Sequence, residues 1–426
     1  MRLLIKNCSI VDPAYDYQGS NDIYIEDGII KRIEALIDLE ADKVIDASGY
    51  SVLPGFVDMH THLREPGFEY KETVYSGTRA AARGGYTTVC CMPNTKPVID
   101  DEASLSRLLD IIKKDAVVNV HPIAAISKGQ KSTEHTDMKR LKEMGAAAFS
   151  DDGKPVMTAA FMREALIAAN ANGWLLIDHC EELSLAEGGA VNFGRKSEQL
   201  GIKGIHPLSE ELNVMRDIML AGETGSRIHI AHISTEGSVK IIREAKDRGV
   251  KVTCEVTPHH IGLDEDIIMP GFTDSKVNPP LRRSRDIKAL KEALKDGTID
   301  AIATDHAPHH KDEKGEDFYS SAFGISGIET AFSVCYTELV EAGILSLKEL
   351  AGKMSSNPAN ILRLETGKIR DGMAADLVIV DIARRITIDR ESFLSKGKNT
   401  PFHGRKYSGD VMYTIVGGNI AYENVL

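Results

Sequence analysis

Between residues 56 and 305 the chain alternates short apolar runs with longer amphipathic runs. The apolar runs have the length and the β-branched content of buried strands, and the longer runs have the spacing of helices with one buried face. One helical run, SVKIIREAKDRG (238–249), ends in a glycine, as helices often do. Eight apolar runs are present, at residues 56–62, 86–92, 117–124, 145–150, 174–179, 227–233, 250–256 and 299–305.

This alternation predicts a parallel sheet, because strands covered by helices on their faces are apolar throughout. Eight such units over about 250 residues predict an α/β fold, a (β/α)8 barrel of the TIM type. A doubly wound open sheet is the alternative for the same pattern. The barrel is favoured because polar side chains follow several of the strands, where a barrel places its active site.

The two ends of the chain have a different pattern, with short strand-like segments separated by turns. Asp27-Gly28 is a typical hairpin turn, and similar turns recur near the C-terminus. We expect both ends to join in one small β-sandwich domain. The predicted division is a β-domain of residues 1–54 and 366–426, and a metal-dependent hydrolase barrel of residues 55–365.

Composition narrows the class of protein further. Hydrophobic residues make up 42% of the chain and charged residues 27%, which is typical of a soluble globular protein. The net charge of -12 argues against nucleic acid or an anionic membrane as the main partner. No apolar run has the length of a membrane span, and the N-terminus resembles a strand rather than a signal peptide. The six cysteines form no CxxC pair, so we expect reduced thiols and a cytoplasmic location.

Histidines and carboxylates gather at the predicted strand ends. His60 and His62 are two residues apart on one strand, so both side chains point to the same face. Imidazole and carboxylate groups without thiolates suit zinc or a similar divalent cation in a hydrolytic site. A carboxylate shared by two ions would make a two-metal centre. The residues at strand ends are His60, His62, Asp151, Asp152, His179, His232 and Asp305.

Each of these residues has an ordinary structural explanation when it is taken alone. An HxH pair can be incidental, His179 can be a hydrogen-bonded core histidine, and Asp305 can be a helix N-cap. Their common position at strand ends favours a shared site. The other histidines lack this support, and His229, three residues before His232, is expected to face away from the metal side.

Nine segments between residues 54 and 330 resemble, in order, the dihydroorotases of the larger bacterial-type class in the amidohydrolase superfamily. They are PGFVDMHTHLREPG, GGYTTVCCMPNT, FSDDGKP, DHCE, AHIST, CEVTPHH, VNPPLR, ATDHAPH and FGISGIET. The resemblance implies a zinc-dependent enzyme that reversibly hydrolyses (S)-dihydroorotate to N-carbamoyl-L-aspartate in de novo pyrimidine (UMP) biosynthesis.

The resemblance also implies roles for particular residues. Six positions match the family's ligands for one or two zinc ions, namely His60, His62, Asp152, His179, His232 and Asp305. Asp152 matches the ligand that bridges two ions, and the adjacent Asp151 stays open as the alternative, because a shift of one residue turns the side chain to the other face. Asp305 matches the general base that later acts as general acid.

A second set of positions matches the family's substrate site. Arg64 matches the group that holds the substrate carboxylate, and a guanidinium fork fits a carboxylate well. Phe323 and Gly324 match a backbone contact to the ring. The complete set of matching substrate-binding positions is Arg64, Asn94, Asn278, His309, Phe323 and Gly324.

Two alternative functions remain open from the sequence. Hydantoinases and allantoinases resemble this chain in the HxH motif, but they use a carboxylated lysine as the bridge, where this chain has Ser150-Asp151-Asp152. A non-catalytic scaffold for aspartate transcarbamoylase is the other alternative, since some family members associate with that enzyme. We expect a homodimer, and the charge and glycine content of residues 306–323 predict a mobile lid.

Overall fold

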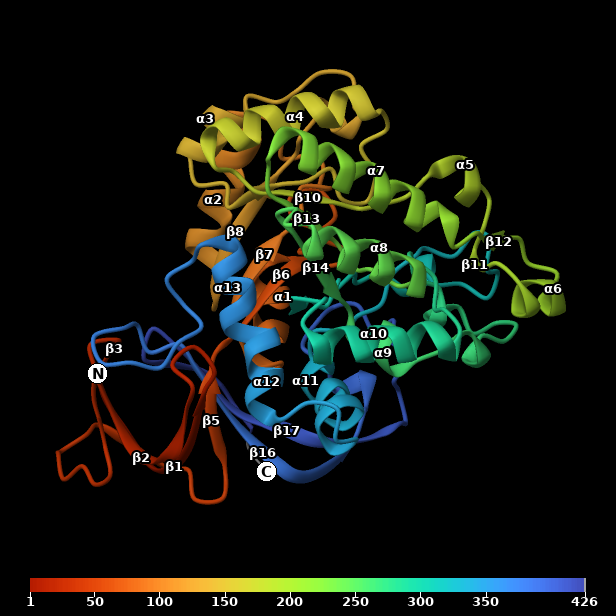
Figure 1. Cartoon of the computed structure of the whole chain (residues 1–426). Helices are drawn as coiled ribbons and strands as arrows, with labels where there is room; N and C mark the ends of the chain where they lie inside the picture. The colour runs from red at the N-terminus through yellow and green to blue at the C-terminus, as the bar shows by residue number, and fades with distance from the viewer. Residues whose placement is uncertain (425–426) are drawn as a thin grey trace.

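The computed structural model describes residues 1–424, and two eight-stranded sheets organise them (Figure 1). In the first sheet all neighbouring strands are parallel and follow one another in chain order. Its strands are β6 (Phe56–Thr61), β7 (Tyr86–Cys91), β8 (Asn119–Ala124), β9 (Ala148–Phe149), β10 (Leu176–Asp178), β13 (Ile228–Ile230), β14 (Val252–Val256) and β15 (Ala301–Ile302). Each predicted apolar run contains one of these strands.

The sheet closes into a barrel between its first strand and the segment after its last one. A parallel bridge joins Thr61 to His306. The backbone amide of His62 donates to the carbonyl oxygen of His306 at 2.9 Å. The predicted (β/α)8 barrel is therefore confirmed.

A helix follows each barrel strand and covers it from outside. Threonine or aspartate side chains cap several of these helices, as Thr73 and Asp101 do by accepting from backbone amides in the first turn. The covering helices are α1 (Val74–Arg83), α2 (Glu102–Asp115), α3 (Met138–Glu143), α4 (Ala159–Asn172), α7 (Leu208–Thr224), α8 (Glu236–Asp247), α10 (Ser284–Asp296) and α11 (Ala331–Cys335).

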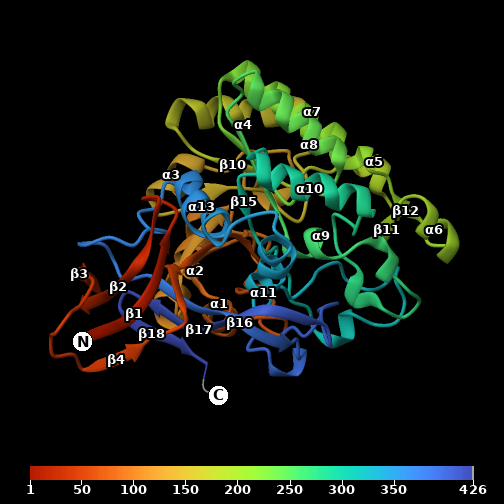
Figure 2. The same cartoon turned by 60° about the horizontal axis from the view of Figure 1, so that its bottom comes forward.

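Further segments are inserted around this framework. Between β10 and α7 lie α5 (Leu183–Ala186), β11 (Val191–Asn192), α6 (Arg195–Leu200) and β12 (Gly204–Ile205), and α6 sits at the edge of the molecule in both views (Figures 1 and 2). The remaining α-helices are α9 (Pro258–Gly262), α12 (Leu347–Ala351) and α13 (Asn357–Leu362), and there are π-helical turns at Tyr336–Glu341 and Gly352–Ser356. Short 3-10 turns lie at Lys128–Gln130, Glu265–Ile267, Thr273–Ser275, Lys311–Glu313 and Arg390–Ser392. None of the helices within residues 1–424 combines the length and apolar character needed to cross a membrane.

The second sheet contains strands from both chain ends, as expected. Its order is β18-β17-β16-β5-β1-β2-β3, and β4 pairs with β1. Because β5 pairs with β1 on one side and β16 on the other, the N-terminal and C-terminal strands belong to one continuous mixed sheet. The strands are β1 (Arg2–Asp12), β2 (Tyr17–Glu26), β3 (Ile29–Glu34), β4 (Lys43–Asp46), β5 (Ser51–Pro54), β16 (Leu377–Thr387), β17 (Lys406–Val416) and β18 (Asn419–Glu423).

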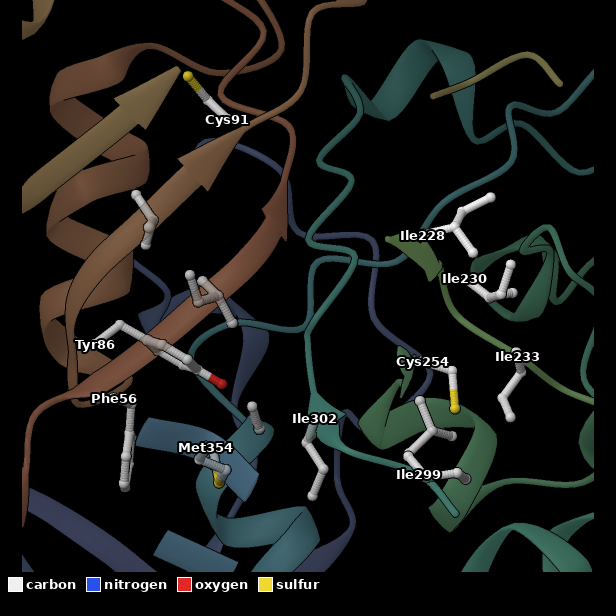
Figure 3. Packing of buried hydrophobic residues seen from close by; sticks show 14 of the residues in the cluster. Phe56, Tyr86, Cys91, Ile228, Ile230, Ile233, Cys254, Ile299, Ile302 and Met354 are labelled. Atoms are coloured by element: carbon white, nitrogen blue, oxygen red, sulfur yellow. The ribbon is translucent and has the colours of Figure 1, made fainter. Parts of the chain in front are cut away.

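One large group of buried apolar residues packs the barrel strands against their helices and also includes residues of the end sheet, such as Leu53 and Val378. Figure 3 shows part of the barrel group, in which Phe56 and Tyr86 pack together. Their ring centroids are 5.6 Å apart, and the Phe332 ring of α11 stacks on Phe56 at 5.5 Å. Burial of one such side chain stabilises the fold by about 1.5–3 kcal/mol. The end sheet has its own group, which includes Ile5 and Ile379.

Candidate metal centre and active site

Four imidazoles and two carboxylates converge at the carboxyl ends of five barrel strands. All six side chains are buried, and none of the residues is more than 6% exposed. They come from β6 or directly after it (His60 and His62), and from the segments after β9 (Asp152), β10 (His179), β13 (His232) and β15 (Asp305). The structure thus brings together all six of the predicted metal ligands.

Asp152 lies in the middle of the four imidazoles. Its Oδ1 is 3.4 Å from His60 Nε2, 3.6 Å from His232 Nε2 and 3.7 Å from His179 Nδ1. Its Oδ2 is 3.4 Å from His62 Nε2. This central position is the one that a ligand shared by two ions would need.

Asp305 completes the group. It follows the last barrel strand and lies across the barrel closure from His60 and His62. Its Oδ1 lies 3.0 Å from His62 Nε2 and 3.5 Å from His60 Nε2. Two overlapping sets, one of His60, His62 and Asp305 and one of His60, Asp152 and His232, each hold their ligand atoms within 4.8 Å of one another. Imidazole nitrogens and carboxylate oxygens at such spacing indicate a metal centre.

The hydrogen bonding of these side chains fits a cation. His60 Nε2 and Asp152 Oδ1 are buried and have no hydrogen-bond partner, although they face each other at 3.4 Å. Buried polar atoms are nearly always paired, so two unpaired atoms that face each other call for a third group between them. A divalent cation would satisfy both.

The adjacent aspartate has a different task. Asp151 Oδ1 accepts from the backbone amides of Ile126 at 2.9 Å and Ser127 at 3.0 Å, and its Oδ2 accepts from the Ser127 hydroxyl. Its carboxylate is therefore occupied with the loop after β8. The structure places Asp152, and not Asp151, among the imidazoles.

The electrostatics of the centre follow from its alternating charges. Burial disfavours the ionised form of Asp152, but His60, His232 and His62 outweigh it and hold the pKa of Asp152 well below its usual range. Burial likewise disfavours a charged His60, yet Asp152 and Asp305 raise the pKa of His60 well above its ordinary value.

Glu255 is a part of the site that sequence reasoning missed. It lies in β14, is fully buried, and its Oε1 is 2.8 Å from His60 Nδ1. Its Oε2 is 3.2 Å from Nε2 of His229, whose Nδ1 reaches Thr253 Oγ1 at 2.8 Å. A carboxylate in an apolar strand was the available signal. His229 indeed lies behind the centre, as expected.

The predicted substrate residues surround the same centre. A cavity of about 220 Å³ is lined by every predicted site residue except His60, which lies behind its wall. Arg64 Nη2 is 3.2 Å from His309 Nε2, and Arg64 Nε donates to the carbonyl oxygen of Pro308 at 3.2 Å. The guanidinium therefore stands beside the carboxylates and imidazoles.

Two asparagines touch the histidines directly. Asn94 Oδ1 is 2.9 Å from His62 Nδ1. Asn278 Nδ2 is 3.4 Å from His179 Nε2 and donates to Glu181 Oε1 at 3.0 Å. Both asparagines thus fix imidazole orientation as well as lining the cavity, which their position after a strand did not reveal.

The segment after β15 forms one wall of the cavity. Glu313 Oε2 is 3.2 Å from His309 Nδ1, and Lys71 Nζ is 2.8 Å from Glu313 Oε1. Gly324 adopts a φ of +140°, and a Cβ placed there would lie 2.7 Å from the carbonyl oxygen of Ala307. Contacts with Lys71 and Glu313 therefore position His309, and neither residue stands out in the sequence.

Three of the converging residues have unusual backbone conformations. φ is +63° at Arg64, +30° at His232 and +46° at Asp305. Non-glycine residues rarely adopt positive φ, and such strain is concentrated at functional sites.

A third group, made of Asp178, Cys180 and Asp217, has the spacing of a metal site but is already paired with an arginine. Arg216 Nη2 lies 2.7 Å from Asp217 Oδ1 and 3.5 Å from Asp178 Oδ2. The guanidinium supplies one positive charge to the group, and burial and the neighbouring Asp217 raise the pKa of Asp178 well above its usual range.

Comparison with known proteins identifies the family. The Dihydro-orotase-like profile matches residues 49–238, and the Amidohydrolase family profile matches residues 221–422. Dihydroorotases of Thermoanaerobacter sp. (strain X514) and Pelotomaculum thermopropionicum are 52% and 50% identical to the chain over 423 and 424 residues. These matches cover 99% and 100% of this chain, and 98% and 99% of the relatives. The chain belongs to the dihydroorotase family.

Solved hydantoinase structures share the fold of this dihydroorotase family member. L-hydantoinase (dihydropyrimidinase) from Arthrobacter aurescens has a TM-score of 0.89 at 25% identity, covering 100% of this chain and 96% of that one. D-hydantoinase (dihydropyrimidinase) from Thermus sp. has a TM-score of 0.84 at 27% identity, covering 99% and 95%. The chain is therefore an amidohydrolase with the barrel of that group.

Proposed function

We propose that the chain is a dihydroorotase that interconverts (S)-dihydroorotate and N-carbamoyl-L-aspartate in de novo pyrimidine (UMP) biosynthesis. The observation that carries this proposal is the guanidinium of Arg64 in one cavity with the histidine and aspartate centre. An anionic ring needs both a carboxylate clamp and a hydrolytic centre within a few ångströms. Full-length identity of about half to dihydroorotases supports the same substrate.

We propose Zn²⁺ as the metal, with one or two ions per chain, held by the six converging side chains. Nitrogen and carboxylate donors without thiolate suit zinc in a hydrolytic site. When bound, the metal would polarise the scissile carbonyl group and make water more acidic.

The chain's own residues would then do the following. Arg64 would hold the substrate carboxylate, and Asn94 and Asn278 would donate neutral hydrogen bonds to the ring. Asp305 would accept a proton from the attacking water and return it to the leaving ring nitrogen, as general base and then general acid. In ring closure the same carboxylate would work in reverse.

The decisive experiment combines metal analysis with an assay of both directions of the reaction. We expect turnover of dihydroorotate that falls on chelation and returns with Zn²⁺. Hydantoin and allantoin are the comparison substrates, because the hydantoinases share the fold. Asp152 stands where those enzymes are expected to use a carboxylated lysine, which favours dihydroorotate. Turnover of hydantoin or allantoin without dihydroorotate would reject the proposal.

The carboxylate clamp has its own test. Arg64→Ala should raise KM for dihydroorotate by about tenfold to a hundredfold, since a hydrogen bond to a charged group contributes about 1.5–3 kcal/mol. Metal content should stay the same. Arg79→Ala, an exposed arginine on α1, is the control and should leave KM unchanged. An unaltered KM in Arg64→Ala would exclude the clamp.

We propose a homodimer with α7 at its interface. Leu208, Leu212, Met215 and Met219 are 42%, 47%, 45% and 67% exposed and follow one another at spacings of four, three and four residues. This is the spacing of an apolar seam between two helices, and a two-fold axis would bring α7 against its own copy.

We also propose a cytoplasmic location and an optional association with aspartate transcarbamoylase. All six cysteines are buried and free, which suits a reducing compartment. Each ligand and clamp position is filled, so the isolated chain should be active and not a scaffold alone. Assays with and without a transcarbamoylase would show whether the partner adds activity.

A further inference from the structure

A second, larger cavity lies beside the proposed active site. Its volume is about 750 Å³, within the range of small-molecule sites, compared with about 220 Å³ for the active-site cavity. Residues of the segments 271–274, 309–314 and 390–403 line it. His309 lines both cavities, so a ligand in the larger one would touch the wall of the active site.

The charge of this cavity is opposite to that of the chain. The whole protein carries a net charge of -12, but five basic and only two acidic side chains line the cavity. The basic residues are Lys311, Lys314, Arg390, Lys396 and Lys398, and the acidic ones are Asp274 and Glu391. Such a local reversal attracts anions.

Most of these cations have no carboxylate partner. Arg390 pairs with both acidic side chains, at 2.8 Å and 3.3 Å. Within residues 1–424, the ammonium groups of Lys311, Lys314, Lys396 and Lys398 form no ion pair. Lys314, Lys396 and Lys398 donate to backbone carbonyl oxygens instead. Four lysines of one cavity thus have no carboxylate partner, although carboxylates are in excess in the chain as a whole.

Two further features point the same way. Burial, together with Lys276, lowers the pKa of Lys314 to about 7 against the opposing effect of Asp274, and an anion in the cavity would offset that cost. Another cavity, of about 450 Å³, borders the active site at Asn278 and Phe323 and is lined by Glu181 and Glu187. Anions are therefore favoured in the cavity lined by lysines and disfavoured in the cavity lined by glutamates.

We propose that the lysine-lined cavity binds a small molecule with two or more negative charges, next to His309. Lys311, Lys396 and Lys398 would supply the charge-assisted hydrogen bonds. Two sources share this chemistry, a phosphate-bearing metabolite and a dicarboxylate such as N-carbamoyl-L-aspartate. The site goes beyond the proposed function. It can be tested separately, because anion binding can be measured without turnover.

Calorimetry of the full-length protein with inorganic phosphate, and separately with N-carbamoyl-L-aspartate, tests the site. The variant Lys311→Gln/Lys398→Gln should weaken phosphate binding by about tenfold or more, since each lost charged hydrogen bond costs about 1.5–3 kcal/mol. The control Lys113→Gln/Lys139→Gln removes two exposed lysines from α2 and α3 and should bind like the wild type. Circular dichroism would verify that both variants fold.

The two ligands distinguish the sources. Loss of phosphate binding in the cavity variant (Lys311→Gln/Lys398→Gln), but not in the control, supports a phosphate-bearing ligand. A second binding event for N-carbamoyl-L-aspartate, lost in the cavity variant and kept in Arg64→Ala, supports a dicarboxylate. Absence of any anion binding that the cavity variant weakens relative to the control would overturn the proposal.

Discussion

Single residues outside the proposed ligand set support the histidines of the candidate metal centre. Glu255 touches His60 from behind, at 2.8 Å, and would keep the proton of that imidazole on Nδ1. With Nδ1 protonated, Nε2 would offer its lone pair to a cation held together with Asp152 and Asp305. Such outer carboxylates fix the orientation and the tautomer of metal-binding histidines.

Glu255→Gln should therefore weaken zinc binding by about tenfold to a hundredfold, as loss of an outer partner of a histidine ligand usually does. Competition with a chromogenic chelator would measure the dissociation constant directly. Thr253→Ala is the matched control, because it removes the partner of His229 in the same strand without touching His60. Equal zinc affinity in both variants would contradict this role.

Gly324 is a second residue whose identity the geometry demands. A methyl group there would meet the carbonyl oxygen of Ala307 at 2.7 Å and His309 Cδ2 at 3.1 Å, at a φ that side chains rarely adopt. Gly324→Ala should destabilise the protein by about 1–3 kcal/mol and raise KM for dihydroorotate.

Denaturant unfolding and steady-state kinetics would measure the two effects. Gly315→Ala is the control, since nothing lies within 4 Å of a Cβ at that position in the same segment. Equal stability and equal KM in the two variants would show that the close packing around Gly324 affects neither folding nor substrate binding.

Local sequence predicted the positions of some of these residues and not of others. The HxH spacing placed His60 and His62 correctly, because strand periodicity depends on backbone geometry alone. The choice between Asp151 and Asp152 needed the structure, since it depends on which carboxylate the loop after β8 uses. Glu255 is distant in sequence from the histidine that it contacts, so no local pattern reveals their pairing.

At the scale of elements, the segment after β15 is held by a charged network around His309. Burial, then Arg64, Lys71 and Lys314, lower the pKa of His309 to about 3, and Glu313 only partly opposes them. His309 is therefore neutral in the folded state, whereas a histidine in the unfolded chain has its ordinary pKa of about 6.5.

This difference predicts a dependence of stability on pH. The contribution of His309 is fully present above about pH 6.5 and is lost as the pH falls towards about 3, because the unfolded state then binds more protons. Between pH 7.5 and 5 the free energy of unfolding should fall by about 2 kcal/mol more in the wild type than in His309→Asn. Urea unfolding at the two pH values would show this, with the exposed His403→Asn as control. Parallel loss in wild type and His309→Asn would refute it.

Helix α7 carries the prediction about assembly. Leu212→Glu/Met219→Glu should convert the proposed dimer to a monomer, because charges in an apolar seam are not compensated by a partner. Sedimentation velocity at micromolar concentration would measure the state. Met269→Glu alters another exposed methionine, outside α7, and should leave the dimer intact. A wild-type monomer at the same concentration would remove α7 as an interface.

Element prediction succeeded where the pattern is repeated and failed where it is short. Eight apolar runs gave the barrel strands in order, because burial on both faces imposes a continuous apolar signal. The Asp27-Gly28 turn also appears as expected, with φ of +50° and +81°. The short insertion with β11 and β12 was not foreseen, since strands of two residues have no periodicity.

For the whole molecule, we propose the division into residues 1–54 with 366–426 and residues 55–365. One buried apolar group, formed only by residues of the two chain ends, supports it, while Leu53 and Val378 of the end sheet join the barrel group. The β-sandwich expected for the chain ends is one continuous sheet, because β5 links the two ends by pairing with β16, which no sequence pattern of either end encodes. Long-range pairing of this kind depends on the folded barrel that lies between the two segments.

The place where the barrel closes has a mechanical consequence. His62 and Asp305 flank the seam between the first and last strands and are 243 residues apart in sequence. A cation that takes ligands from both flanks binds only when the barrel is closed, so its binding free energy stabilises the closed seam. Removing the metal should therefore loosen this protein first along that seam, well before its helices melt.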